Sequence, residues 1–258
     1  MTDDCDPIAE FDKLFCLDDK VDNGQRQFDV FISKEGDKPI IVVHELPGMT
    51  KPFLCYCIKM ANQGFKVYAP LMFGKMGKAK SSLQMLSLCI SSEFRKLYWR
   101  NQTEGQPESQ FTRWLLHLAG VVSSRHESRK VGVIGMCLTG SFALVTFAEP
   151  AVNSVVCCQP AFPFVFRESL GLTKTQQCNV RREVNKLGAG CAQGYRYKNA
   201  PLSRQSHVDS TVSFMNDDGV ERFTYKTLKG CKHSVVTDKK RNLTTENDIL
   251  EFVNARLS

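Results

Sequence analysis

Three side chains in this sequence have the chemistry needed for covalent catalysis, and each follows a segment typical of a β-strand. They are Glu45, Cys137 and His233. A thiol with an imidazole in reach can pass its proton to the ring and attack an ester or lactone carbonyl as a thiolate. Water would then hydrolyse the resulting acyl-enzyme. The types and the order of these residues therefore predict nucleophilic catalysis by cysteine.

The cysteine lies where a strand is expected to turn sharply into a helix. Residues 130–149, KVGVIGMCLTGSFALVTFAE, begin with a β-branched run and continue into a segment typical of a buried helix. Gly135 and Gly140 flank Cys137, as a corner too tight for ordinary side chains requires. Because such a glycine frame arises by chance in about one chain of this composition in twenty, it needs the support of the other two residues.

Two backbone groups and one carboxylate would complete this chemistry. The N–H groups of Leu138 and Leu46 would form the oxyanion hole, the first of them at a helix N-terminus. Glu45 could act as an auxiliary base, or hold the cysteine as a thiol until substrate binds. The structural alternatives are a buried hydrophobic Cys137, a surface-loop His233 and a solvated Glu45, and we favour the functional interpretation because the three occur together.

The elements that must position these residues alternate between strands and helices. Strands are predicted at 27–33, 39–46, 65–70, from 131 into the corner, 153–160, 191–197 and 222–228. Helices are predicted at 53–63, 81–98, 111–124, 138–144 and 203–214, with a last amphipathic helix capped by Thr245. Such an order favours an α/β fold with a parallel sheet, whose strand ends gather the three residues along one edge. The aromatic loop at 161–166 is either core filler or the wall of an apolar pocket.

Length and composition fit one large domain or two small ones, and we find no convincing linker between two. The chain has 258 residues, of which 42% are hydrophobic and 24% are charged. We divide it into an acidic lead segment, 1–27, and a single domain, 28–258. Because the N-terminus is acidic and no long apolar run follows, we expect no secretion signal, no membrane association and a cytoplasmic location.

Charge narrows the choice of partners. Residues 1–22 hold eight acidic residues and two lysines, so this stretch carries −6 and the remainder +13 of the net charge of +7. The basic body lacks the interleaved aromatic residues of nucleic-acid modules, so we expect no nucleic-acid binding. It could, however, steer an anionic small-molecule substrate toward the protein. Oligomeric state leaves no signal in the sequence.

The 11 cysteines are odd in number and scattered through apolar segments, which favours thiols over disulfides. Cys55 and Cys57 lack a second ligand pair at zinc spacing, so we expect them in a helix core rather than on a metal. A redox role for Cys137 is weaker than a catalytic one because no resolving cysteine lies near it in sequence.

The sequence resembles the dienelactone hydrolase family, which has the α/β-hydrolase fold. The resemblance extends over roughly residues 28–253 and rests on four segments: His44-Glu45, GFKVYAP at 64–70, GMCLTG at 135–140 and His233-Ser234. It implies a single-domain enzyme that lacks cofactor and metal and hydrolyses a lactone or carboxylic ester. Carried over by position, it implies Cys137 as nucleophile, His233 as base and Glu45 as activating carboxylate. His44 is interpreted as structural.

Two positions depart from the family pattern. Thr139 stands where many members carry glycine, which we expect to be tolerated if the helix sits slightly further from the strand. The family's acid position holds Asn199 rather than a carboxylate. Asn199 could orient His233 as in Cys-His-Asn enzymes, Asp209 could reach in from the next helix, or the triad is incomplete. The rival to an enzyme is therefore a non-catalytic protein that keeps the fold for ligand binding or interaction.

Overall fold

Runs of β-branched and aromatic residues form the strands of a sheet at the centre of the protein. The structure, a computed structural model, describes residues 6–18, 21–46, 48–78, 108–127, 129–161, 170–238 and 242–258. The helix predicted at 81–98 and residues 162–166 of the aromatic loop lie outside these ranges.

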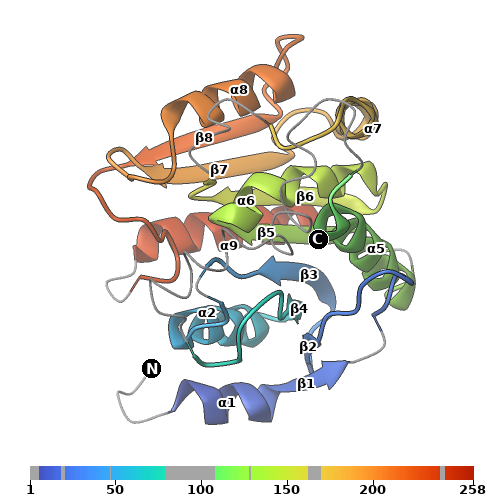
Figure 1. Ribbon diagram of the computed structural model, residues 1–258, viewed down its shortest axis with the longest axis vertical. Coiled ribbons are helices and arrows are strands. Elements are labelled where there is room, and N and C mark those ends of the chain that lie inside the picture. Colours follow the sequence, from blue (N-terminus) through green and yellow to red (C-terminus); the bar gives the residue numbers. More distant parts are fainter. Residues whose placement is uncertain are drawn as a thin grey trace.

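The described residues form an eight-stranded sheet in the order β1-β2-β4-β3-β5-β6-β7-β8, which Figure 1 shows from bottom to top. The strands are β1 (Phe15–Asp18), β2 (Val30–Ser33), β3 (Lys38–Val43), β4 (Phe65–Pro70), β5 (Val131–Met136), β6 (Val152–Cys158), β7 (Ala192–Tyr197) and β8 (Phe223–Leu228). β2 is antiparallel to both β1 and β4, and the pairs from β4 to β8 are parallel. The predicted α/β architecture is therefore confirmed.

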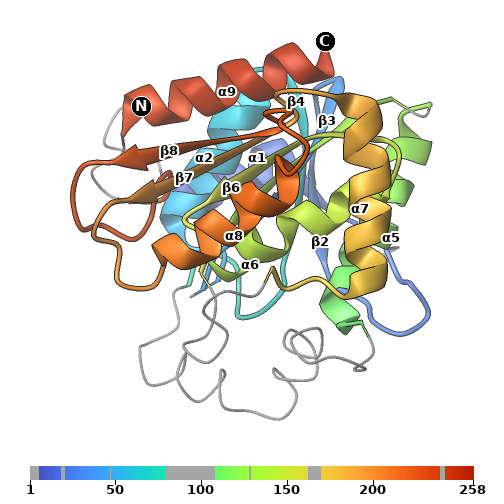
Figure 2. The same ribbon diagram turned by 90° about the horizontal axis from the view of Figure 1, so that it is seen from above.

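Helices cover both faces of this sheet, as Figure 2 shows from above. The helices are α1 (Pro7–Leu14), α2 (Lys51–Asn62), α5 (Gln110–Arg125), α6 (Leu138–Phe142), the 3-10 helix η3 (Ala143–Ala148), α7 (Lys174–Leu187), α8 (Gln205–Met215) and α9 (Leu243–Leu257). One core joins the sheet to α5, α6, η3 and α7, and the other joins it to α1, α2 and α9. Burial of these two apolar faces is the main force that holds the layers together.

Element boundaries follow the capping residues. β4 matches its prediction at both ends, and α2 begins after the Thr50 cap with proline in its first turn. β3 ends at Val43, three residues before the predicted end, so Glu45 lies in a turn beyond the strand. The prediction that Thr245 caps the last helix is wrong, because Asn242 accepts the Thr245 N–H and α9 begins at Leu243.

The acidic lead segment and residues 174–187 form elements that were not predicted from the sequence. The acidic lead segment contributes α1, capped by Asp6, and β1, which extends the sheet beside β2. α7 has only Gln176, Val180, Glu183 and Val184 buried, so its apolar stripe is too short to stand out in sequence. Its N-terminus does carry a capping box between Thr173 and Gln176.

Within the described ranges, no helix is long and apolar enough to cross a membrane. The cysteines that the structure describes form no disulfide with one another. Cys57 is buried and Cys55 half-buried on α2, consistent with the predicted core position of this pair.

Candidate active site

Cys137 occupies the corner between β5 and α6. Its backbone has φ 57° and ψ −120°, a conformation that L-residues rarely adopt and that is typical of strained functional turns. Neighbouring backbone holds this conformation. The Cys137 N–H donates to the carbonyl of Cys158 at 2.9 Å, and its own carbonyl accepts from the N–H of Ala161 at 3.0 Å. The side chain is 5% exposed.

Two glycines allow the corner to close. A Cβ at Gly135 would lie 2.5 Å from the carbonyl oxygen of Thr139, and one at Gly140 would lie 2.8 Å from that of Cys158. Contacts this short do not occur for real Cβ atoms, so strand and helix approach as closely as glycine permits. The expected wider spacing at Thr139 is therefore not seen.

Thr139 instead fits the corner through hydrogen bonds. Its Oγ1 accepts from the N–H of Met136 at 2.9 Å. The carbonyl oxygens of Met136, Val43 and His44, at 2.8, 3.1 and 3.2 Å, are alternatives for its single proton. The hydroxyl thus connects the corner at Cys137 to the end of β3, two residues before Glu45.

Glu45 is a buried carboxylate that several hydrogen bonds hold at this edge. It is 4% exposed and accepts hydrogen bonds from three side chains, Gln159 at 2.9 Å, Ser234 at 2.9 and 3.0 Å, and Thr237. Ser234 and Thr237 belong to the loop that carries His233, so the carboxylate fixes this loop against the ends of β3 and β6. A buried carboxylate needs such donors because its desolvation is otherwise costly.

Gln159, Ser234 and Thr237 were not singled out from the sequence. Each forms its contact with Glu45 across more than 100 residues of chain. The available signal was weak: Gln159 is a polar residue directly after a β-branched strand, and Ser234 follows the candidate histidine.

His233 lies in the loop after β8, on the same edge of the sheet. Burial lowers the pKa of its imidazole below the ordinary value, while the negative charge of Glu45 acts in the opposite direction. Neither ring nitrogen has a hydrogen-bond partner among the residues that the structure describes. The lowered pKa favours the neutral imidazole, which is the form that can take a proton.

His44 has a structural role, in line with its interpretation from sequence. It is fully buried, and burial lowers its pKa to about 4. Nε2 accepts the N–H of Met72 at 3.0 Å, so Nδ1 carries the proton and donates to the carbonyl of Glu45 at 3.0 Å. The ring joins the ends of β3 and β4.

Position 199 after β7, where the family carries its acid, takes no part in the hydrogen bonds around Glu45. Asn199 is exposed, and the hydrogen bond that the structure gives it runs from its backbone N–H to the carbonyl of Gly230. Asp209 is also exposed and accepts from Gln205 on its own helix. The structure thus brings neither side chain into hydrogen-bond contact with His233. The role of Asn199 remains a prediction.

Arg196 on β7 holds the loop that contains Asn199. Its guanidinium is buried and donates to the carbonyls of Ser203 and Lys198 and to the side chain of Gln205. Arg196 thus holds the backbone of this loop, as the Glu45 carboxylate holds the loop of His233.

The two residues expected to donate to the oxyanion follow β5 and β3. Leu138 is the first residue of α6, a position whose N–H has no acceptor within its own helix. Leu46 is in the turn after β3, directly after Glu45.

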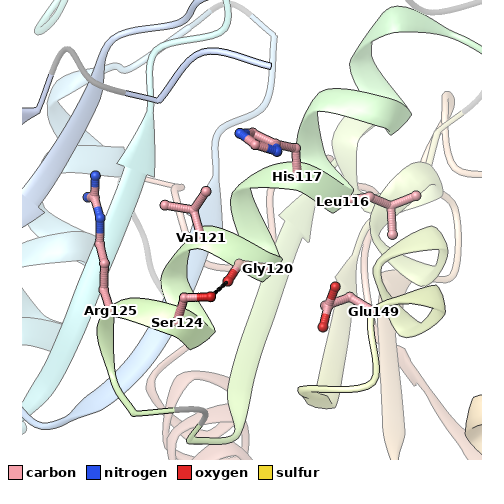
Figure 3. A pocket seen from close by; sticks show the side chains of 7 residues that line it. All are labelled: Leu116, His117, Gly120, Val121, Ser124, Arg125 and Glu149. Carbon is pink, nitrogen blue, oxygen red and sulfur yellow. Dashed lines mark hydrogen bonds between the residues drawn. The ribbon is translucent and has the colours of Figure 1, made fainter. Parts of the chain in front are cut away.

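The hollows of the described residues include two that neither Glu45, Cys137 nor His233 lines. One, of about 530 Å³, lies over α5 and is lined mainly by that helix, with Glu149 opposite Gly120 (Figure 3). The other, behind α6 near Gly140 and Ser141, has only about 10 Å³ of room, enough at most for one water molecule. In the part of the chain that the structure describes, no three His, Cys, Asp or Glu side chains cluster to hold a metal ion.

A parallel sheet preceded by antiparallel strands, with a strained corner at Cys137 between the central strand β5 and its helix, defines an α/β-hydrolase fold. Residues 29–182 match the sequence profile of the dienelactone hydrolase family, which includes Glu45 and Cys137 but not Asn199 or His233. The chain belongs to this family.

Solved structures show the same fold. A Klebsiella pneumoniae protein described as a dienelactone hydrolase aligns with a TM-score of 0.66 and 15% identity, over 94% of this chain and 97% of its own. The dienelactone hydrolase of Anabaena variabilis aligns with a TM-score of 0.61 and 11% identity, over 95% and 100%. The Pyrococcus furiosus esterase Pf2001 gives 0.62 and 10%, over 100% and 96%. No curated protein matches the chain in sequence.

Proposed function

We propose that this protein hydrolyses a small lactone or carboxylic ester through a thioester on Cys137. The observation that carries the proposal is the backbone of Cys137, held at φ 57° at the start of α6 with glycines closing the corner around it. A structural cysteine in the core does not need a strained backbone, whereas in a nucleophile elbow the strained turn holds the reactive atom clear of the sheet. The basic body of the chain supports an anionic substrate.

In the acylation step, His233 takes the proton of the Cys137 thiol, and the thiolate attacks the substrate carbonyl carbon. The carbonyl electron pair moves to oxygen, where the N–H groups of Leu138 and Leu46 stabilise the negative charge. The intermediate collapses with cleavage of the C–O bond. The departing alkoxide takes the proton from His233 and leaves a thioester.

In the deacylation step, His233 takes a proton from water, and the hydroxide attacks the thioester carbonyl. Collapse expels the thiolate of Cys137, which recovers the proton, and releases the carboxylic acid. The negative charge of Glu45 beside the histidine loop favours the imidazolium formed in each step.

The acid position is the open part of this proposal. The alternatives are Asn199 as the residue that orients His233, Asp209 in that role, and an incomplete triad. Mutation of Asn199 tests the first, and mutation of Asp209 separates the other two. In each case the proposed nucleophile and base are the same.

A non-catalytic role, in ligand binding or interaction, is the rival function. The specific observation in its favour is that neither ring nitrogen of His233 has a hydrogen-bond partner among the described residues. An imidazole that is not oriented is a weaker base, since general acid–base catalysis depends on geometry.

Hydrolysis of p-nitrophenyl esters and of a dienelactone by the wild type and by Cys137→Ala and Cys137→Ser tests the proposal. We expect turnover by the wild type and a fall of about 10³-fold or more in Cys137→Ala, because the residues of a catalytic unit act together. Cys178→Ala is the matched control, since this cysteine is exposed on α7, and its turnover should equal that of the wild type. Absence of wild-type turnover, or unchanged turnover in Cys137→Ala, overturns the proposal.

A further inference from the structure

Gln159 connects three parts of the candidate site that come from distant segments of the chain. It follows Cys158, whose carbonyl accepts the N–H of Cys137 at 2.9 Å. Its side-chain amide donates to Glu45 at 2.9 Å and accepts the N–H of Val235 at 3.0 Å. The side chain is fully buried, so each of these bonds is shielded from water.

The backbone of Gln159 is itself constrained. Its φ of 36° lies in the left-handed region that favours glycine. Its N–H donates to the carbonyl of Tyr195 on β7 at 2.6 Å. A residue with a side chain in this conformation indicates that the side chain is needed there, because glycine would fit the backbone with less strain.

The partners determine how the amide is oriented. Glu45 as a carboxylate can only accept, and the N–H of Val235 can only donate, so the amide nitrogen must face Glu45 and the amide oxygen must face Val235. Glutamate at this position could keep the bond to Val235 but would turn an acceptor toward Glu45. The two halves of the amide can therefore be tested separately.

We propose that Gln159 is a positioning residue, which holds the Glu45 carboxylate and the His233 loop in register with Cys137. It touches no reacting atom and acts through Glu45 and through Val235, two residues beyond His233. This inference rests on the proposed hydrolase function, which it deepens by naming a further residue of the same site.

Four variants test the proposal: Gln159→Met, Gln159→Glu, the exchange Glu45→Gln with Gln159→Glu, and Gln176→Met as matched control. Gln176 is a buried glutamine of α7 that bonds Thr112, away from the site. We expect Gln159→Met to lower kcat by about 10²-fold with little change in KM, as misplacement of catalytic groups does. The kcat of Gln159→Glu should fall by as much, although this variant can keep the bond to Val235. The kcat of Gln176→Met should equal that of the wild type.

The exchange variant separates positioning from folding. It restores a donor–acceptor pair between positions 45 and 159 but moves the charge, so we expect its urea midpoint to return toward the wild type while kcat stays low. A wild-type kcat in Gln159→Glu overturns the proposal, because it would show that only the bond to Val235 matters. Recovery of kcat in the exchange variant also overturns it, because the site would then work with an amide at position 45 and would not need the carboxylate that Gln159 is proposed to hold.

A second readout does not depend on turnover. Alkylation of Cys137 by iodoacetamide, followed on its peptide by mass spectrometry, should be about tenfold slower in Gln159→Met than in the wild type, since a misplaced His233 forms less thiolate. Gln176→Met should react at the wild-type rate. If the wild type hydrolyses no ester, the proposed function fails while this rate still decides the role of Gln159. Equal rates in wild type and Gln159→Met overturn it.

Discussion

Two loops at the same edge of the sheet are held in opposite ways. Around Glu45, buried side chains bond one another, and the carboxylate accepts from Gln159, Ser234 and Thr237. After β7, the buried guanidinium of Arg196 bonds mainly to backbone carbonyls, and Asn199 points no hydrogen bond at His233. The first arrangement fixes side chains and the second fixes only the path of the chain.

This difference indicates which side of His233, the Glu45 network or the loop after β7, can fix the geometry of catalytic groups. A network of buried charge and hydrogen bonds constrains rotamers as well as backbone, as preorganised catalysis requires. A loop held by its carbonyls tolerates any exposed side chain at position 199. We therefore expect function to depend on the Glu45 side of His233 more than on the acid position.

The largest effect should come from Glu45→Ala. It leaves two buried donors, Gln159 and Thr237, and the half-buried Ser234 without their acceptor, so we expect the free energy of unfolding in urea to fall by about 3 kcal/mol. Ester hydrolysis should fall by about 10²-fold in the protein that remains folded. Glu183→Ala is the matched control, because this carboxylate is also buried but pairs with exposed Arg182 and Lys186 on α7. Equal losses in the two variants would contradict the special role of Glu45.

Thr139→Val should have the next largest effect. The substitution keeps the shape of the side chain and removes the hydroxyl that accepts from Met136 and bonds the end of β3. We expect a loss of about 1–2 kcal/mol in stability, measured by urea unfolding, because a buried N–H loses its partner. Thr211→Val, whose hydroxyl bonds only the preceding turn of α8, should lose less. A larger loss there would show that the corner is not specially braced.

The pH dependence of kcat/KM tests how Glu45 acts on His233, the proposed base. Because burial lowers the pKa of His233, the acid limb of kcat/KM should have its midpoint below the ordinary histidine value of 6.5. Glu45→Gln removes the charge that raises this pKa, so the limb should move to still lower pH. Movement to higher pH would mean that Glu45 does not act electrostatically on His233.

The smallest effect is expected from Asn199→Ala. The side chain is exposed and bonds nothing at the site, so kcat and stability should change by about twofold or less, as for ordinary surface substitutions. Steady-state kinetics with a p-nitrophenyl ester measure this directly. A fall of tenfold or more would establish Asn199 as the residue that orients His233.

Much of this fold could be predicted because local signals mark the ends of its elements. Gly64 and Pro70 bound β4, and Thr50 and Pro52 start α2. α7 escaped prediction because its residues are mostly polar, and the end of β3 was misplaced because His44 and Glu45 are buried as deeply as the strand.

The site was predictable where one segment carries its own pattern, as at Cys137. It was not predictable where partners are far apart in sequence. Gln159 and Thr237 lie 114 and 192 residues from Glu45, and no local pattern records a bond of that kind. The bracing by Arg196 was missed for a related reason, since a buried arginine on a strand has no signature until its carbonyl partners are in place.

The most direct measurement is the mass of the protein trapped during turnover of p-nitrophenyl acetate. Acid quenching in the first turnovers, followed by peptide mass spectrometry, should find one acetyl group on the peptide that contains Cys137, labile to hydroxylamine as a thioester is. Turnover without an acetyl group on Cys137, or with the acetyl group on another residue, would contradict the account.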